Sequence, residues 1–572
     1  MEVDVSLVKD KVRVSTAQIV VEHGNLEKNM RNIKRRIDEA ADNGAELVVF
    51  PETAHHGYIY DTFDEGYSQS TPVPGPITDQ ICDKARENSI YVVIGVAERL
   101  EYLTVYNSGI LIGPKGDILG IYRKNFITMT DKKWQQPGDT GCPVFKTPIG
   151  NISIFICGDG RVPEIARLEA LNGADIICGL EAWFSRDMYI FNKPSRAIEN
   201  GIWLIESDRP KSEEYPMIYP GHSFIMDPRG NMIAEASEDK EEIIYADIAP
   251  KEARNKKIGL RNDLFKDRRP ELYRLLTTPV KKLPLTKILD TPVVPRKMTI
   301  NTFAIQTYPV FKNPQANLES ILPRIQRAAA YYGKLIVLPE LFMTGCAFKK
   351  AEEAEKVAEG IKGRTVSEIS KITSSYKAYV AFSMIEKDGG KLFNTAVLVG
   401  PNGVVGKYRK THLWNMEKLW CTPGDIEYPV FETEFGNVGM MVGYDGFFPE
   451  VTRILMLKGA DVVAWPCSWT SQLYPVYLCP VRAYETRVFL VAADRIGKEG
   501  DERYIGQSML VDPNGVVLAK ASADKEDHFF RKIDLALARS KEIQINVDTH
   551  FHRRPGMYKA FTKENLILEF TQ

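Results

Sequence analysis

Two stretches of the chain decide the fold: NISIFICGDGRVPE at residues 151–164 and NVGMMVGYDGFFPE at residues 437–450. Each contains a short apolar run, a turn with Asp and Gly, and a Pro-Glu pair that is typical of the first turn of a helix. The pattern predicts a buried strand, a sharp turn and a helix. Cys157 lies where the first strand meets its turn, and Gly443 has the same place in the second stretch.

These stretches are part of an internal repeat that extends through the 572-residue chain. Similar segments recur at an offset of 285 to 288 residues: VVFPE with IVLPE, YRKN with YRKT, NGAD with KGAD, and GHSFIMDPRG with GQSMLVDPNG. The constant offset indicates a tandem duplication. We predict a first domain of residues 1–290 and a second of residues 291–572, joined in a Pro-rich stretch.

Each half opens with a strand, a helix and a second strand. In the first half the helical spacing of apolar residues runs from Leu26 to Ala40, and the strand AELVVF follows and leads into Glu52. The second half repeats this order up to Glu340. Such an order predicts an α/β fold in which functional groups gather beyond the carboxyl ends of strands.

The setting of Cys157 also predicts its chemistry. A helix N-terminus presents free N–H groups and a positive dipole end, which favour the thiolate form of a cysteine. A nucleophile exposed on a turn between strand and helix is a known arrangement in hydrolases.

Taken together, both halves resemble the nitrilase superfamily of carbon–nitrogen hydrolases. The family's Glu, Lys and Cys fall on Glu52 in PE, Lys124 in RK, and Cys157 followed by Asp159 and Pro-Glu. The resemblance implies an αββα sandwich, duplicated in tandem, with no metal and no organic cofactor. A second acid that the family carries between Lys and Cys falls on Asp131, one methylene shorter than the usual Glu.

The second half departs from this resemblance at one position. Glu340, Lys410 and Glu417 match the family's pattern, but Gly443 stands where the Cys belongs. Because glycine has no side chain, this site cannot form a covalent intermediate. We therefore expect all turnover in the first half.

The residue types imply a hydrolytic route. Cys157 would attack, Glu52 would act as base, Lys124 would stabilise the oxyanion, and Asp131 would orient Lys124. The implied substrate is a small amide or N-carbamoyl compound, because Asp two residues after the nucleophile resembles amidases and carbamoylases. Nitrile hydrolysis, acyl transfer to an amine, and a binding or regulatory pseudoenzyme are the alternatives.

Three further residues are candidates for substrate binding. Arg161 follows the nucleophile by four residues and has Phe447 as its counterpart, so it could hold a substrate carboxylate. Its alternative role is to cap or pair with the following helix. Glu181 differs from its counterpart Cys467 and could face the substrate, and His56 lies in the loop after the PE motif.

Composition limits the partners. With 74 Lys plus Arg against 75 Asp plus Glu, the chain lacks the basic surface that nucleic acid needs, and no apolar run is long enough to cross a bilayer. The eight scattered cysteines indicate neither a disulfide framework nor a zinc site. We expect a cytoplasmic protein with a small-molecule amide, ureido or nitrile substrate. Family resemblance adds that the halves dock as an intrachain pseudo-dimer, with further homo-oligomers left open.

Overall fold

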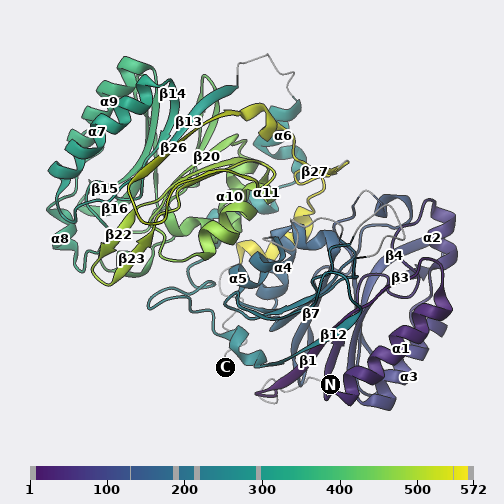
Figure 1. The fold of residues 1–572 in the computed structure, drawn as a ribbon. Coiled ribbons are helices and arrows are strands. Elements are labelled where there is room, and N and C mark those ends of the chain that lie inside the picture. Colours follow the sequence, from purple (N-terminus) through teal and green to yellow (C-terminus); the bar gives the residue numbers. More distant parts are fainter. Residues whose placement is uncertain are drawn as a thin grey trace. The chain divides into compact units, whose positions relative to one another are not determined.

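A computed structural model describes residues 8–128, 130–183, 192–211, 219–290, 298–544 and 546–563. The chain divides into two compact units, the first extending to Lys256 and the second beginning at Lys257. The short segment Gln544–Val547 groups with the first unit. Within the described ranges each unit contains two six-stranded mixed sheets with helices, as the sequence predicts (Figure 1).

The first unit consists of two sheets that face each other. One sheet contains, in spatial order, β12 (Glu242–Ile248), β1 (Val12–Gln18), β2 (Leu47–Val49), β3 (Tyr91–Leu100), β4 (Thr104–Ile112) and β5 (Ile118–Arg123). The other contains β11 (Met232–Glu235), β10 (Phe224–Met226), β9 (Trp203–Ser207), β8 (Ile176–Leu180), β7 (Gly150–Ile156) and β6 (Phe145–Thr147). Hydrogen bonds from Thr16 Oγ1 to Glu206 O (3.0 Å) and from Ser207 Oγ to Ala17 O (2.9 Å) join the two sheets.

Helices cover the outer faces of this pair of sheets (Figure 1). Helices α1 (Leu26–Asp42) and α3 (Pro76–Asn88) pack on the first sheet, and α4 (Pro163–Leu171) and α5 (Lys193–Asn200) accompany the second. The apolar residues Met30, Ile33 and Ile37 recur at helical spacing and are buried in the core between α1 and the sheet. The layer order is therefore helix, sheet, sheet, helix, the αββα sandwich expected from the sequence.

The second unit repeats the architecture. Its first sheet contains β17 (Gly403–Arg409), β16 (Lys391–Gly400), β15 (Tyr379–Asp388), β14 (Gly333–Val337), β13 (Thr299–Gln306) and β26 (Asp527–Asp534). The second contains β18 (Val430–Thr433), β19 (Gly436–Met440), β20 (Val462–Pro466), β21 (Phe489–Ala493), β24 (Met509–Val511) and β25 (Val517–Lys520). The helices are α7 (Pro314–Ala330) and α9 (Arg364–Tyr376) on one side, and α10 (Pro449–Leu457) and α11 (Cys479–Thr486) on the other.

The Pro-punctuated segment after Lys256 packs within the second unit. Asn262 Nδ2 donates to Leu413 O at 2.8 Å, and Arg268 Nε donates to Glu450 Oε1 at 3.2 Å. Helix α6 (Pro284–Asp290) ends this segment. Residues 257–290 thus make their contacts with the half of the chain that follows them.

Among the described helices, none combines the length and the apolar character needed to cross a bilayer.

Candidate active site

Cys157 begins a tight turn at the end of a central strand. Strand β7 ends at Ile156, and the turn η3 (Cys157–Arg161) follows before α4 begins at Pro163. The backbone φ angle of Cys157 is +44°, in a region that residues with a side chain rarely adopt. The sequence correctly predicts strand, turn and helix, but the separate turn keeps Cys157 away from the first turn of the α-helix.

A buried carboxylate holds this turn in place. Asp159 accepts hydrogen bonds from the backbone N–H groups of Ile156 (3.2 Å) and Phe126 (2.6 Å). The hydroxyl of Tyr122, near the end of β5, donates to the same side chain at 2.6 Å. Asp159 therefore fixes the nucleophile turn against the segment that carries Lys124.

Three charged side chains meet beside the turn. Lys124 Nζ lies 2.8 Å from Glu52 Oε1 and 2.8 Å from Asp131 Oδ2, and all three side chains are fully buried. Burial acts to lower the pKa of Lys124, but the charges of Asp131 and Glu52 raise it well above its ordinary value. The lysine is therefore a permanent cation, and Asp131 bonds it despite being shorter than the usual Glu.

One oxygen of Glu52 is bonded and the other is open. Oε1 accepts from Lys124 and from Asn107 Nδ2, at 2.8 and 2.6 Å. Oε2 is buried and has no hydrogen-bond partner among the described residues. A buried, unbonded carboxylate oxygen is available to take a proton.

The side chain of Cys157 rests as the neutral thiol. Burial raises its pKa well above the ordinary value, the charge of Glu52 raises it further, and Lys124 opposes them. The expectation of a thiolate from a helix N-terminus is therefore wrong, because the helix begins six residues later and Cys157 is buried among carboxylates.

The three candidate substrate-binding residues have different surroundings. Glu181 directly follows β8, is fully buried and forms an ion pair with Lys193. Arg161 is buried as the last residue of η3. His56 is half-buried with its ring 5.2 Å from that of His55, and it has no bond to the charged trio in the described residues. A substrate role for each of the three stays a prediction.

Sequence reasoning missed several residues that support this site. Asn107, on β4, bonds Glu52 and has Asn394 as its counterpart at nearly the repeat offset. Arg209 donates from one guanidinium nitrogen to the carbonyl O of Glu52 at 2.8 Å, and its counterpart is Arg495. Polar residues repeated in both halves were the signal that could have identified them.

The second half brings the same types of group together, but both carboxylate oxygens of its first glutamate are hydrogen-bonded. Glu340 Oε1 accepts from Lys410 Nζ (2.7 Å) and Asn394 Nδ2 (2.8 Å). Lys410 Nζ also donates to Glu417 Oε2 at 2.6 Å. Ser468 Oγ donates to Glu340 Oε2 at 2.5 Å, so both oxygens of this carboxylate are bonded.

Gly443 keeps the backbone geometry of a nucleophile turn. Its φ angle is +46°, against +44° at Cys157. A Cβ placed on Gly443 would overlap Glu340 Oε2. The carboxylate of Glu340 therefore occupies the space that a nucleophile side chain would need.

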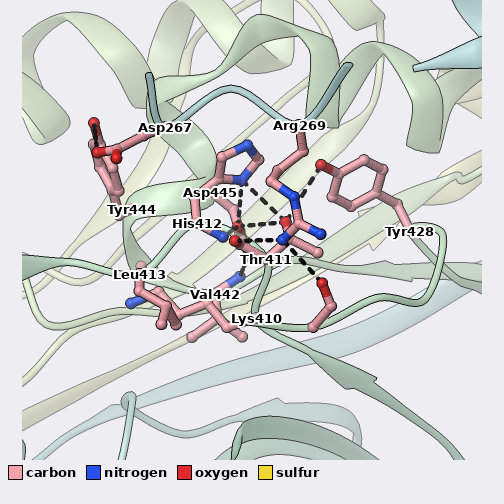
Figure 2. A network of polar contacts seen from close by, with 12 residues as sticks. Asp267, Arg269, Lys410, Thr411, His412, Leu413, Tyr428, Val442, Tyr444 and Asp445 are labelled. Carbon is pink, nitrogen blue, oxygen red and sulfur yellow. Dashed lines mark hydrogen bonds and ion pairs between the residues drawn. The ribbon is translucent and has the colours of Figure 1, made fainter. Parts of the chain in front are cut away.

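The turn of the second half is anchored by a larger polar network, shown in Figure 2. Asp445, the counterpart of Asp159, accepts from the backbone N–H of Val442 at 2.9 Å and lies 2.8 Å from His412 Nδ1. Arg269 of the segment after Lys256 donates to Thr411 O at 3.1 Å (Figure 2). Where the first half has Phe126, the second has His412. Its Nε2 lies 3.1 Å from the hydroxyl of Tyr273, so His412 connects the segment after Lys256 to Asp445 of the turn.

A cavity of about 40 Å³ adjoins the second site and is lined by Lys410, Glu417 and Ser468 among others. This volume is enough to hold water. Within the described ranges, no group of three or more His, Cys, Asp or Glu side chains is arranged to hold a metal ion.

Comparison with known proteins matches most of the chain to one family model. The model described as "Carbon-nitrogen hydrolase" matches residues 11–257 and again residues 303–542. A protein from Pyrococcus abyssi named "Nitrilase" is 39% identical over 255 residues, which cover 44% of this chain and 97% of that protein. An "(R)-stereoselective amidase" from Pseudomonas sp. is 32% identical over 224 residues, covering 38% of this chain and 79% of the amidase.

Among solved structures, the amidase from Nesterenkonia sp. is 21% identical and aligns with a TM-score of 0.40. The alignment covers 47% of this chain and 97% of that chain.

Proposed function

Because this chain belongs to the carbon–nitrogen hydrolase family, we propose that its first half hydrolyses a non-peptide C–N bond in a small amide or N-carbamoyl compound. The reaction runs through a thioester on Cys157. The observation that carries the proposal is the open oxygen of Glu52, beside a Lys124 ammonium that is held by ion pairs to Glu52 and Asp131.

In the first step the sulfur of Cys157 attacks the substrate carbon. Glu52 takes the thiol proton, since the neutral thiol is the resting form. The ammonium of Lys124 is fixed between two carboxylates and stabilises the negative charge that develops on the substrate oxygen. The proton held by Glu52 then passes to the leaving nitrogen, and ammonia or an amine departs.

In the second step water hydrolyses the thioester. Glu52, again ionised, removes a proton from the water as it attacks, and the acid product leaves with the thiol restored. Asp131 and Asn107 act on the positions of Lys124 and Glu52. No covalent chemistry is assigned to the second half, where Gly443 has no nucleophile to offer.

Nitrile hydrolysis is the second candidate, because a relative 39% identical is named a nitrilase. It would use the same nucleophile and base. The two activities differ in the substrate carbon that is attacked and in the need for an additional water molecule.

The test is a panel of amides, ureido acids and nitriles, scored by released ammonia and by mass spectrometry of the Cys157 peptide. We expect ammonia together with a substrate-derived thioester on Cys157, and neither in Cys157→Ala. Ammonia only from nitriles would select the second candidate. Saturable ligand binding with no product and no adduct would instead favour a pseudoenzyme.

A further inference from the structure

A second group of buried charges lies in the first unit, outside the trio of Glu52, Lys124 and Asp131. Glu181, Lys193 and Glu206 are fully buried. Lys193, the first residue of α5, forms an ion pair with Glu181 and lies 3.9 Å from Glu206 Oε2. Burial acts to lower the pKa of Lys193, but the two carboxylates raise it, so this side chain remains a cation.

The group lies directly beneath the nucleophile turn. Ile156 pairs with Leu180 in the parallel register of β7 and β8, so Cys157 and Glu181 follow neighbouring strand ends. A Cβ on Gly160, within the turn itself, would overlap Lys193 Nζ. The ammonium therefore touches the turn that carries the sulfur.

The second half has no charge at any of these positions. The counterparts of Glu181, Lys193 and Glu206 are Cys467, Cys479 and Ala492. Trp465 replaces Gly179 and packs its indole against Gly446, the counterpart of Gly160. A neutral aromatic ring thus supports the turn in the half that lacks the nucleophile.

Comparing the two halves shows whether the turn needs a charged group beneath it or only a well-packed one. Burial raises the pKa of both Glu181 and Glu206, and the two side chains hydrogen-bond each other, which requires a proton between them. Burying such groups costs free energy, and a well-packed apolar replacement is often neutral or stabilising. Since the fold forms with Trp465 in the second half, packing alone does not require the charged group in the first.

We propose that Lys193 is a positioning residue for Cys157: its ammonium, held by Glu181 and Glu206 beneath the turn, stabilises negative charge on the Cys157 sulfur. The inference rests on the proposed function of the first half. Lys193 does not bond the substrate in this role. It acts through the turn and through its field, beside the oxyanion role of Lys124.

Several titratable groups act on Cys157 from the surrounding elements. Burial and the charges of Glu52 and Glu181 raise its pKa, while Lys124 and Lys193 lower it. The phenols that face it are Tyr58 and Tyr219. Neither Lys193 nor Glu181 performs a step of the proposed chemistry, and alkylation of Cys157 is measured without substrate, so a substrate-binding role of Glu181 does not enter the measurement.

The experiment measures alkylation of Cys157 by iodoacetamide in the full-length chain across a pH series, quantified on the Cys157 peptide by mass spectrometry. In Lys193→Met we expect the reaction at neutral pH to slow by about tenfold, which corresponds to one unit of pKa. The matched control is Lys256→Met. Lys256 is a second buried lysine, whose Nζ donates to the carbonyl O atoms of Asn200 and Gly201 at 2.9 Å, at the other end of α5. Its loss should leave the alkylation rate unchanged.

Glu181→Gln tests the opposite sign. Removing this carboxylate leaves the ammonium facing Cys157 with less compensation, so alkylation should become faster. Identical pH profiles for Lys193→Met and Lys256→Met would overturn the proposal, as would slower alkylation in Glu181→Gln. If Lys193→Met does not fold, the alkylation rate of Glu181→Gln alone tests the proposal. Because alkylation needs no turnover, a protein without hydrolase activity would still give a clear answer.

Discussion

The two halves of the molecule carry nearly the same charged groups at their strand ends, but they differ in how the oxygens of the first glutamate are bonded. Glu52 Oε2 has no partner among the described residues, whereas Glu340 Oε2 accepts a hydrogen bond from Ser468 at 2.5 Å. The residue that corresponds to Ser468 is Ala182. A single hydroxyl thus distinguishes an unsatisfied base from a satisfied one.

This difference shows how the second half accommodates the same carboxylate beside a glycine in place of the cysteine. An unsatisfied buried carboxylate costs stability but is ready to take a proton. In the second half the carboxylate of Glu340 is fully bonded, and Gly443 adopts the positive φ angle without a side chain. Two copies of one fold thus hold the same glutamate, one with an unsatisfied oxygen and one fully bonded.

The largest expected effect comes from removing the nucleophile. Cys157→Ala should lower turnover by on the order of 10⁴-fold or more, because the covalent route then has no attacking atom. Glu340→Gln, the matched change in the closed site, should leave turnover as it is. Ammonia release under saturating substrate measures both variants. Full activity in Cys157→Ala would show that Cys157 is not the nucleophile and that the two halves do not differ in this respect.

The next effect concerns the hydroxyl that separates the two sites. Ala182→Ser should lower kcat by about 10²-fold, the lower range for general-base catalysis, because the new hydroxyl would bond Glu52 Oε2. Ser468→Ala is the reverse change in the second half and should not alter kcat. Steady-state kinetics on both variants test this, and an unchanged kcat in Ala182→Ser would mean that Oε2 is not the proton acceptor.

Protonation of the base gives a third prediction. Burial raises the pKa of Glu52 above its ordinary value of 4.5, although Lys124 opposes the shift. As the base must be ionised, kcat/KM should fall about tenfold per pH unit below a midpoint that lies above 4.5. In Ala182→Ser the midpoint should move to lower pH, because a donated hydrogen bond favours the ionised form. pH–rate profiles of both proteins measure the midpoints, and a wild-type midpoint at or below 4.5 would contradict the assignment.

The smallest expected effect is on stability. Gly443→Cys should lower the free energy of unfolding by about 1–2 kcal/mol, since a side chain is forced into the left-handed region. Its Cβ also overlaps Glu340, so Gly443→Ala should cost a similar amount. Urea unfolding compares the variants, with Ser468→Ala added to release Glu340 and recover part of the loss. An unperturbed Gly443→Cys protein would show that the second site tolerates a nucleophile.

The sequence was sufficient for the parts of this site that repeat along the chain. Glu52, Lys124 and Cys157 follow strand ends, and the repeat gives Glu52 and Lys124 a second copy and Cys157 a matching turn around Gly443. The sandwich follows from the same repeat and the family resemblance. Local patterns of this kind depend on neighbouring residues, which a sequence displays directly.

What the sequence could not give is contact between distant residues. Ala182 and Ser468 are unremarkable in their own segments, and their importance appears only when each is placed against the Glu of another strand. Lys193 and Glu206 are far apart in the chain from Cys157 and meet beneath its turn through strand register. The resting thiol likewise depends on burial, which no local pattern measures.

The closed carboxylate of Glu340 also restricts how the duplicated chain can evolve. A Gly443→Cys replacement meets Glu340, and a Ser468→Ala replacement alone frees a base with no nucleophile beside it. A site arranged like that of the first half would therefore need both replacements in the same chain, a side chain at position 443 and the removal of the hydroxyl at position 468.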